Sequence, residues 1–249
     1  MLRNLTWVAI LLSTVAAHCV LAQNLAGTGC GIRDGVLVHG LRSGRDIALT
    51  FDACPTRNVP GFAAAVVDYL SRESVPATFF LSGRWAQKHA PALKQMAAIP
   101  AFELALHGFA HRHLDGTNPA DIQKEIDDGR ATLQKLGVAP APLFRPPYGE
   151  TPAALAQAAR AASVTPVLWD VAPGDPDAHQ TAEMLERSVL QHTRGGSIIV
   201  MHVNGRGVGT AAAVPKIVNA LRSRGFNFVT VSVLLRACQS DSTTPRGNP

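Results

Sequence analysis

The sequence predicts an α/β protein built on a parallel sheet, and two observations lead to this fold class. Short apolar runs of strand length alternate with helical patterns about seven times along the chain, and such regular alternation builds a parallel sheet with helices outside. The 249 residues are 47% hydrophobic, which is enough for one sizeable core and favours a single domain. This pattern is compatible with both an open sheet and a barrel.

The strands are predicted where short apolar runs lie between turn or loop signals. The first run ends directly before Asp52 and follows a stretch, 23–45, that is rich in glycine and polar residues. We expect that stretch to be an irregular lead-in. The complete set of predicted strands is 46–51, 76–81, 102–106, 143–144, 165–169, 197–201 and 226–231.

The helices are predicted from apolar residues at helical spacing and from start and stop signals. Phe62, Val66 and Leu70 form an apolar stripe. A proline directly after Asn118 marks the start of a helix that stops at Gly137. The predicted helices are 60–71, 85–98, 118–136, 151–162, 181–192 and 210–224.

The N-terminus has the features of a secretory signal peptide. Arg3 gives a positive start, residues 5–17 are mostly apolar, and Val20-Leu21-Ala22 is a small-residue cleavage pattern. The apolar run is short for a membrane span, so we expect a secreted or periplasmic protein without stable membrane insertion; an uncleaved anchor is the alternative. The tail is polar and contains two prolines, which predicts disorder. The expected boundaries are a signal peptide at 1–22, the lead-in at 23–45, one domain at 46–236 and the tail at 237–249.

Three cysteines remain once the signal peptide is removed. Export implies an oxidising compartment, where cysteines tend to pair, and an odd count leaves one over. Cys30 and Cys238 lie at the two ends of the domain, and chain ends are often close together. We therefore predict a Cys30–Cys238 disulfide with Cys54 free; three free thiols are the alternative.

Composition excludes some classes of partner. The formal net charge is +5, which falls by one when Arg3 is removed with the signal peptide. No basic cluster is interleaved with aromatic residues, so a nucleic-acid partner is not expected. At 6%, aromatic residues are too sparse for a broad sugar-stacking platform. A monomer is expected.

Polar residues follow the predicted strands directly, at the carboxyl ends where α/β enzymes collect their sites. A polar residue after an apolar run has to be paired or functional, and several together favour a hydrolytic site. His107 and His111 are four residues apart, so both imidazoles would lie on one side of a turn and could share a metal ion if the chain coils after the strand. The alternatives are that both are ordinary loop histidines, or that His113 offers a rival spacing. The strand-end residues are Asp52, His107 with His111, Arg145, Asp170 and His202.

At these residues the chain resembles a known family. The five segments occur in the order, and at roughly the separations, of the five motifs of polysaccharide deacetylases. Over about residues 45–235 the chain is similar to the NodB-homology domain of carbohydrate esterase family four. The segments are Thr50-Phe51-Asp52, His107-Gly-Phe-Ala-His111, Arg145-Pro-Pro-Tyr148-Gly149, Trp169-Asp170 and Val200-Met-His202.

The resemblance implies a fold, a cofactor and a reaction. The fold would be a distorted (β/α) barrel of about seven units, related to the TIM barrel but with fewer than eight units. The cofactor would be a divalent metal, most often zinc, bound by His107 and His111. The reaction would remove acetyl groups, N-acetyl foremost, from an acetylated glycan.

The resemblance also implies roles for the remaining site residues. Asp52 would be the general base that activates water, and His202 would be the general acid that protonates the leaving amine. Arg145 would orient Asp52, and Asp170 would orient His202 and keep it charged. The backbone N–H of Tyr148 would help to bind the oxyanion.

The chemistry requires these residue types. Amide hydrolysis at neutral pH needs a strong nucleophile, which a metal supplies by lowering the pKa of water from ~16 toward ~7. A carboxylate at hydrogen-bond distance can accept the proton. A cationic imidazole, favoured by a neighbouring carboxylate, can protonate the poor leaving group. The metal and one N–H can share the charge that develops on the carbonyl oxygen.

The sequence departs from the family pattern at one position. The family's first motif usually has a second aspartate, which is the third protein ligand to the metal, and Ala53 occupies that position. Catalytic zinc normally has three protein ligands. Asp52 could bind the metal itself, the Cys54 thiolate could bind it, or waters could complete the shell. Cys54 as a small buried residue near the site is the alternative interpretation, and it is the one we favour.

Three further residues are predicted to contact substrate. Tyr148 and Trp169 would line a sugar cleft, although Trp169 could equally belong to the core. Arg206 lies in the glycine-rich segment 204–209 directly after His202, which would border the cleft or form a plain surface turn. A catalytically silent glycan-binding relative is the main alternative to an enzyme. Hydrolysis of another linear amide is a third possibility, which the secretion signal disfavours.

Overall fold

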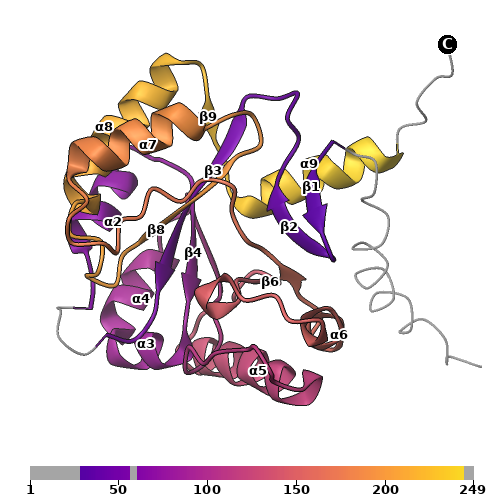
Figure 1. The fold of residues 1–249 in the computed structure, drawn as a ribbon. Coiled ribbons are helices and arrows are strands. Elements are labelled where there is room, and N and C mark those ends of the chain that lie inside the picture. The colour runs from indigo at the N-terminus through magenta and orange to yellow at the C-terminus, as the bar shows by residue number, and fades with distance from the viewer. Residues whose placement is uncertain (1–28, 57–60, 244–249) are drawn as a thin grey trace, which may run out of the picture.

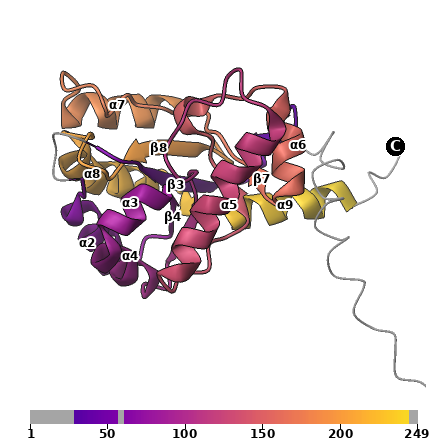
Figure 2. The same ribbon diagram turned by 90° about the horizontal axis from the view of Figure 1, so that it is seen from below.

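The chain folds around a seven-stranded parallel sheet, seen here in a computed structural model that describes residues 29–56 and 61–243. The strand order is β7-β6-β5-β4-β3-β8, and β9 pairs with β3. Helices surround the strands on the outside (Figures 1 and 2). The strands of this sheet are β3 (Asp46–Ala53), β4 (Ala77–Leu81), β5 (Phe102–Leu106), β6 (Leu143–Phe144), β7 (Thr165–Pro166), β8 (Ile198–His202) and β9 (Asn227–Phe228).

The segment after β7 closes the sheet into a distorted barrel. It begins beside β6, where the Val167 N–H donates to the Phe144 carbonyl at 2.8 Å. It ends beside β8, where the Val200 N–H donates to the Val171 carbonyl at 3.0 Å. One short stretch therefore joins the two edges, β7 and β8, which confirms the (β/α) barrel expected from the family resemblance.

The register brings the strand ends to one level. Asp52 lies opposite His202 of β8 and opposite Phe80 of β4. Leu106 of β5 lies opposite Phe144 of β6, so the residues that follow these two strands, His107 and Arg145, emerge side by side. Because the strands are parallel, all of these side chains meet at the carboxyl end of the barrel.

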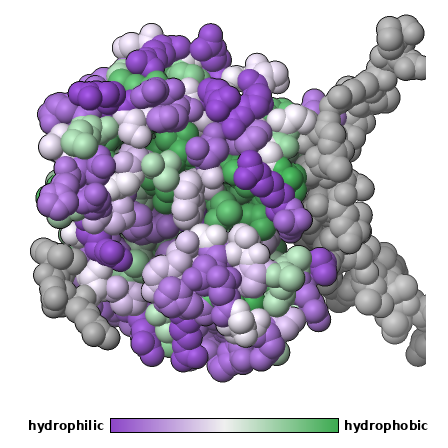
Figure 3. Space-filling model, viewed as in Figure 1, coloured by the Kyte–Doolittle hydropathy of each residue, from purple (hydrophilic) through white to green (hydrophobic). Residues whose placement is uncertain are grey.

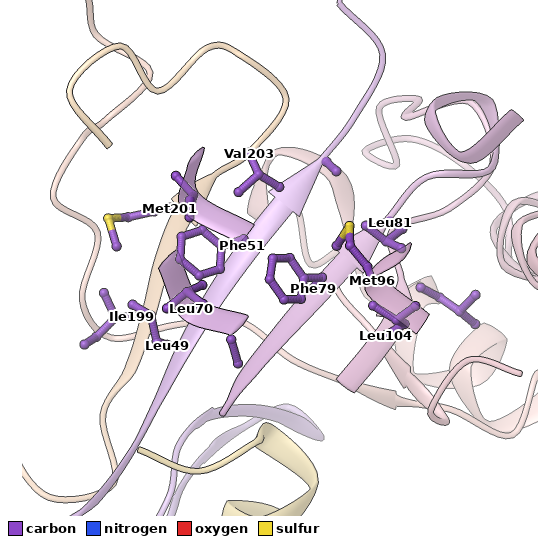
Figure 4. Packing of buried hydrophobic residues seen from close by; sticks show 14 of the residues in the cluster. Leu49, Phe51, Leu70, Phe79, Leu81, Met96, Leu104, Ile199, Met201 and Val203 are labelled. Atoms are coloured by element: carbon purple, nitrogen blue, oxygen red, sulfur yellow. The ribbon is translucent and has the colours of Figure 1, made fainter. Parts of the chain in front are cut away.

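The main core lies between the sheet and the helices. Phe51 and Phe79 stack with ring centroids 5.3 Å apart, beside Leu49, Leu81 and Ile199 (Figure 4). Hydrophobic residues show near the centre of the face in Figure 3, within a mostly hydrophilic periphery. The covering helices are α2 (Ala64–Arg72), α3 (Gly83–Lys88), α4 (Ala90–Ala97), α5 (Pro119–Lys135), α6 (Ala154–Ala161), α7 (Ala182–His192) and α8 (Thr210–Ser223).

The last helix closes the opposite end of the barrel. In α9 (Val231–Thr243) the Val231 N–H donates to Thr78 Oγ1 at 3.0 Å, and the Ser232 N–H to Glu103 Oε2 at 3.3 Å. Thr78 and Glu103 lie at the beginnings of β4 and β5. The amino end of the barrel is therefore covered by α9, while the carboxyl end carries the polar strand-end residues.

Several sequence-based boundaries were wrong. The lead-in 23–45 is not irregular throughout, because β1 (Gly31–Arg33) and β2 (Val36–His39) form an antiparallel hairpin. The predicted helix 85–98 is two helices separated at His89, whose φ of −118° and ψ of 35° are not helical. The predicted tail is helical over residues 237–243, which end α9. Residues 1–22 and 244–249 lie outside the described residues.

The cysteine predictions are confirmed. Cys30, just before β1, is disulfide-bonded to Cys238 of α9. Cys54 is a free, buried thiol. Among the residues described, no helix is both long and apolar enough to cross a membrane.

Candidate active site

The centre of the site is Asp52, a buried carboxylate at the end of β3. Its side chain is only 5% exposed, and Arg145 Nη1 donates to its Oδ1 at 2.7 Å. Burial alone would raise the pKa of Asp52, but the Arg145 guanidinium, followed by His107 and His202, outweighs burial and lowers that pKa. Asp52 is therefore ionised at neutral pH, and the expected pairing with Arg145 is present.

His107 faces the second oxygen of this carboxylate. Its Nε2 lies 3.7 Å from Asp52 Oδ2, and its Nδ1 lies 2.7 Å from the Arg145 carbonyl oxygen. A carbonyl can only accept, so Nδ1 carries the proton and Nε2 keeps its lone pair. Burial lowers the pKa of His107 despite the neighbouring Asp52 carboxylate. The ring is therefore neutral and in the form that binds metals.

His111 lies beside His107, as the spacing predicts. The two ring centroids are 4.8 Å apart and the planes meet at 70°. Burial, followed by the proximity of His107, lowers the pKa of His111 to about 3. Two neutral imidazoles thus lie side by side, and that of His107 faces the ionised Asp52 carboxylate.

The loop that carries both histidines rests on α5. Glu125 Oε1 accepts the N–H groups of Phe109 at 3.0 Å and Ala110 at 2.5 Å. A Cβ at Gly129 would lie 2.7 Å from the Gly108 carbonyl oxygen, so only glycine lets the helix approach this closely. The helix therefore fixes the loop between the two imidazoles.

The side chains around His107 include donor types that suit a divalent cation, but few of them. Neutral imidazole nitrogens with an ionised carboxylate are the ligand types that zinc takes in proteins. Ala53, which follows Asp52 and is fully buried, offers no ligand. Across 29–56 and 61–243, no group of three or more His, Cys, Asp or Glu side chains is arranged to hold a metal ion. The ligands that the described residues offer at this place are therefore the two imidazoles of His107 and His111, with the Asp52 carboxylate 3.7 Å from His107.

Cys54 is engaged elsewhere. Its Sγ accepts a hydrogen bond from Asn204 Nδ2 at 2.9 Å. Burial, followed by the nearby Asp52 charge, raises the pKa of the Cys54 thiol to about 11. The side chain is a neutral, buried thiol, which supports its interpretation as a small buried residue rather than a ligand.

His202 has a different acidic partner from the one predicted. Its Nδ1 lies 2.9 Å from Asp175 Oδ1, and its backbone N–H donates to Asp175 Oδ2 at 2.7 Å. Thr210 Oγ1 donates to the same Oδ2 at 2.7 Å. Burial would lower the pKa of His202, but the Asp175 carboxylate, with Asp52 further away, outweighs burial and raises it. The imidazole is therefore favoured in its cationic form.

The expected pairing of Asp170 with His202 is wrong, because the hydrogen bonds of Asp170 go to other residues. Asp170 Oδ2 accepts from Arg42 Nη2 at 2.7 Å and from Ser197 Oγ at 3.0 Å. Its Oδ1 accepts the Ile198 N–H at 2.8 Å. Asp170 thus fixes the beginning of β8, at the end of the strand remote from His202. The sequence contained one signal that was missed, a second aspartate in the same segment.

The predicted substrate contacts differ in their surroundings. Tyr148 is 54% exposed, and its ring centroid lies 4.5 Å from that of His111. Within the described chain, the Tyr148 backbone N–H has no hydrogen-bond acceptor. Trp169 is half-buried, with the Arg145 guanidinium 5.4 Å from its ring centroid. Arg206 is exposed, and its backbone N–H donates to Asn204 Oδ1 at 3.2 Å, within a turn.

The chain matches a known protein family. The family model described as Polysaccharide deacetylase matches residues 40–167, slightly more than half of the chain. The chain belongs to the polysaccharide deacetylase family. The matched region contains the strand ends that carry Asp52, the histidine pair and Arg145.

Individual polysaccharide deacetylases align over most of their length. The peptidoglycan-N-acetylglucosamine deacetylase of Bacillus cereus is 32% identical over 76% of this chain and 88% of its own. The chitooligosaccharide deacetylase of Azorhizobium caulinodans is 30% identical over 72% of this chain and 90% of its own. A crystal structure of a peptidoglycan N-acetylglucosamine deacetylase superposes with a TM-score of 0.73 at 29% identity, covering 80% of this chain and 92% of the other.

Proposed function

We propose that this polysaccharide deacetylase is a metal-dependent hydrolase that removes N-acetyl groups from an acetylated glycan outside the cytoplasm. The observation that carries the proposal is the carboxyl end of the barrel. There an ionised Asp52 faces the neutral His107, and His202, whose pKa is raised, lies on the adjacent strand. The names of the relatives, which include peptidoglycan and chitooligosaccharide deacetylases, support a glycan substrate.

His107 and His111 would hold the divalent metal, for which zinc is the first candidate. When bound, the metal would make a water molecule more acidic and polarise the acetyl carbonyl. Both imidazoles are neutral because their pKa values are lowered, so neither has to lose a proton first.

Asp52 would act as the general base. Its carboxylate is ionised, and one oxygen is fixed by Arg145 Nη1 at 2.7 Å. The other oxygen faces the space beside His107 and is available to take a proton from the attacking water. Arg145 thereby leaves Oδ2 as the oxygen that can accept a proton, which is the orienting role expected from the family resemblance.

His202 would act as the general acid. Asp175 binds Nδ1, which leaves Nε2 as the nitrogen that can donate a proton to the leaving amine. The raised pKa favours the protonated form of the imidazole. This assignment transfers to Asp175 the role that the sequence gave to Asp170. The uncommitted N–H of Tyr148 is a suitable donor for the oxyanion.

Substrate would lie against the exposed Tyr148, with Trp169 and Arg206 as further contacts. Secretion or a periplasmic location and a monomeric state remain the expectations from the sequence. The main alternative is a catalytically silent glycan-binding relative, and the observation that favours it is Ala53 in place of a third ligand.

The deciding experiment combines metal analysis with acetate release from chitin oligomers, peptidoglycan and acetylated xylan. Stoichiometric metal with acetate release supports the proposal. Glycan binding without turnover, even with added zinc, cobalt or nickel, supports the silent relative. Turnover of only small linear amides would indicate the third possibility. His202→Ala is expected to lose at least about 10²-fold in kcat while retaining metal, and His192→Ala on the exposed face of α7 is the matched control.

A further inference from the structure

The loop after the histidine pair is tied to the loop that carries Tyr148. Glu150 accepts three hydrogen bonds from the first loop: from His113 Nδ1 at 2.6 Å, from the Leu114 N–H at 2.6 Å and from the Asp115 N–H at 3.2 Å. The His113 bond, followed by the two backbone N–H groups, lowers the pKa of Glu150. One side chain therefore joins two segments that are more than thirty residues apart in sequence.

A row of stacked rings makes a second connection between the same loops. The His113 and Tyr148 rings are parallel within 7°, with centroids 3.9 Å apart. The Tyr148 and His111 rings are also in contact, at an angle of 67° with centroids 4.5 Å apart, and the His111 and His107 rings at 70° with centroids 4.8 Å apart. His113, whose side chain is 68% exposed, is the outer end of a row of rings that reaches the buried imidazole.

The backbone at both loops is held in an uncommon conformation. His111 and Tyr148 each have a φ of 59°, in the left-handed region that residues with a Cβ disfavour. Residues in this conformation are strained and persist only where the surroundings hold them in place. The Glu150 bonds and the His113 stack are contacts that flank both positions.

We propose that His113 and Glu150 are positioning residues of the deacetylase reaction, which hold the His111 imidazole and the Tyr148 N–H in their working places. The inference rests on the proposed function, because the working places are those of a metal ligand and an oxyanion donor. Neither His113 nor Glu150 touches the reacting atoms in this role. From the sequence, His113 was considered as a rival spacing to the His107–His111 pair.

Turnover measurements on four variants test this role. His113→Ala and Glu150→Ala are each expected to lower kcat about tenfold, with KM for a chitin oligomer within about twofold, because a misplaced donor weakens the transition state selectively. His113→Phe keeps a ring for the stack and is expected to recover to within about threefold of the wild type. Glu150→Gln, which keeps an acceptor oxygen for Leu114, is expected to lie between Glu150→Ala and the wild type.

Zinc affinity provides a readout that does not depend on turnover. Calorimetric titration of the metal-free protein is expected to show about tenfold weaker binding in His113→Ala, as is typical when a partner that orients a ligand is removed. Glu183→Ala is the control, because it removes an exposed glutamate that pairs with Lys216 on another face. That control is expected to match the wild type in both assays.

The outcomes separate this inference from the proposed function. An inactive wild type refutes the proposed function, and the zinc titration then decides the positioning role alone. Unchanged kcat and unchanged zinc affinity in folded His113→Ala and Glu150→Ala would overturn the inference. A raised KM with unchanged kcat would also overturn it, since this would show that His113 contacts the sugar directly.

Discussion

A polar residue that directly follows a buried parallel strand could be located from the sequence, because the sheet register fixes its position. Asp52, His107 and Arg145 are such residues, and the structure brings them together. The partner of His202 could not be located in this way. Asp175 lies in a loop, and its contact with β8 depends on how that loop folds back. Asp170, the acidic residue that directly follows the predicted strand 165–169, binds the beginning of β8 instead.

Replacing Asp175 is expected to move the basic limb of the pH–rate profile. His202 must be protonated to donate, so kcat falls as pH rises through its pKa, which Asp175 raises. Asp175→Asn removes that charge, and the basic limb should shift to lower pH by about one unit or more. Steady-state kinetics over pH measures the shift. Asp170→Asn is the control and should leave the limb in place; a shift there but not in Asp175→Asn would restore Asp170 as the partner.

Replacing Arg145 is expected to affect both the acidic limb and the stability. The guanidinium holds the pKa of the buried Asp52 below its usual value, so the stability this pair contributes is present above the unfolded pKa of about 3.9 and is lost as pH falls through the folded pKa. Arg145→Gln leaves Asp52 buried without its cation. The acidic limb should move to higher pH, and the free energy of unfolding at pH 7 should fall by about 3–5 kcal/mol.

Denaturant titrations at several pH values check this expectation. Arg222→Gln, which removes an exposed partner of Glu73, should change the unfolding free energy by less than about 1 kcal/mol. An Arg145→Gln protein as stable as that control would show that the buried pair is not important for the fold.

Long elements with clear signals could be predicted closely, and short ones could not. The helix from Asn118 was expected at 118–136, and α5 spans Pro119–Lys135, with the Asn118 side chain accepting the Asp121 N–H at 3.0 Å. The β1–β2 hairpin has only short strands in a glycine-rich stretch, so no periodicity could reveal it. The predicted strand 226–231 is longer than β9 and includes the first residue of α9, because Val229, Thr230 and Val231 are β-branched residues typical of strands. Packing over the end of the barrel decides in favour of the helix.

Helix α5 packs so closely against the histidine loop that a methyl group added at Gly129 should disturb the contact. Gly129→Ala would place its Cβ 2.7 Å from the Gly108 carbonyl oxygen, a backbone atom that cannot move without shifting the loop. The free energy of unfolding should fall by about 1–3 kcal/mol despite the better helix propensity of alanine. Thermal denaturation measures the loss. Gly44→Ala, where the nearest atom would be 3.9 Å away, is the control and should be nearly neutral.

At the scale of the whole molecule, alternation of strands and helices could not decide between an open sheet and a barrel. That choice depends on the few residues from Val167 to Val171, whose hydrogen bonds to Phe144 and Val200 join the two edges. The two ends of the barrel have different roles, because all strands of the sheet are parallel and their carboxyl ends meet on one side. The site lies at the carboxyl end, whereas α9, which carries Cys238 of the disulfide, covers the amino end.

The disulfide is therefore expected to stabilise the molecule without affecting its chemistry. It joins residues 208 positions apart and fixes α9 to the strand that begins the fold. The double variant Cys30→Ala/Cys238→Ala should lose about 2–5 kcal/mol of unfolding free energy. Its kcat at a temperature where it remains folded should match that of the wild type, because no disulfide atom lies at the strand ends that carry Asp52 and His202. A fall in kcat without a fall in stability would mean that the two ends of the barrel are coupled.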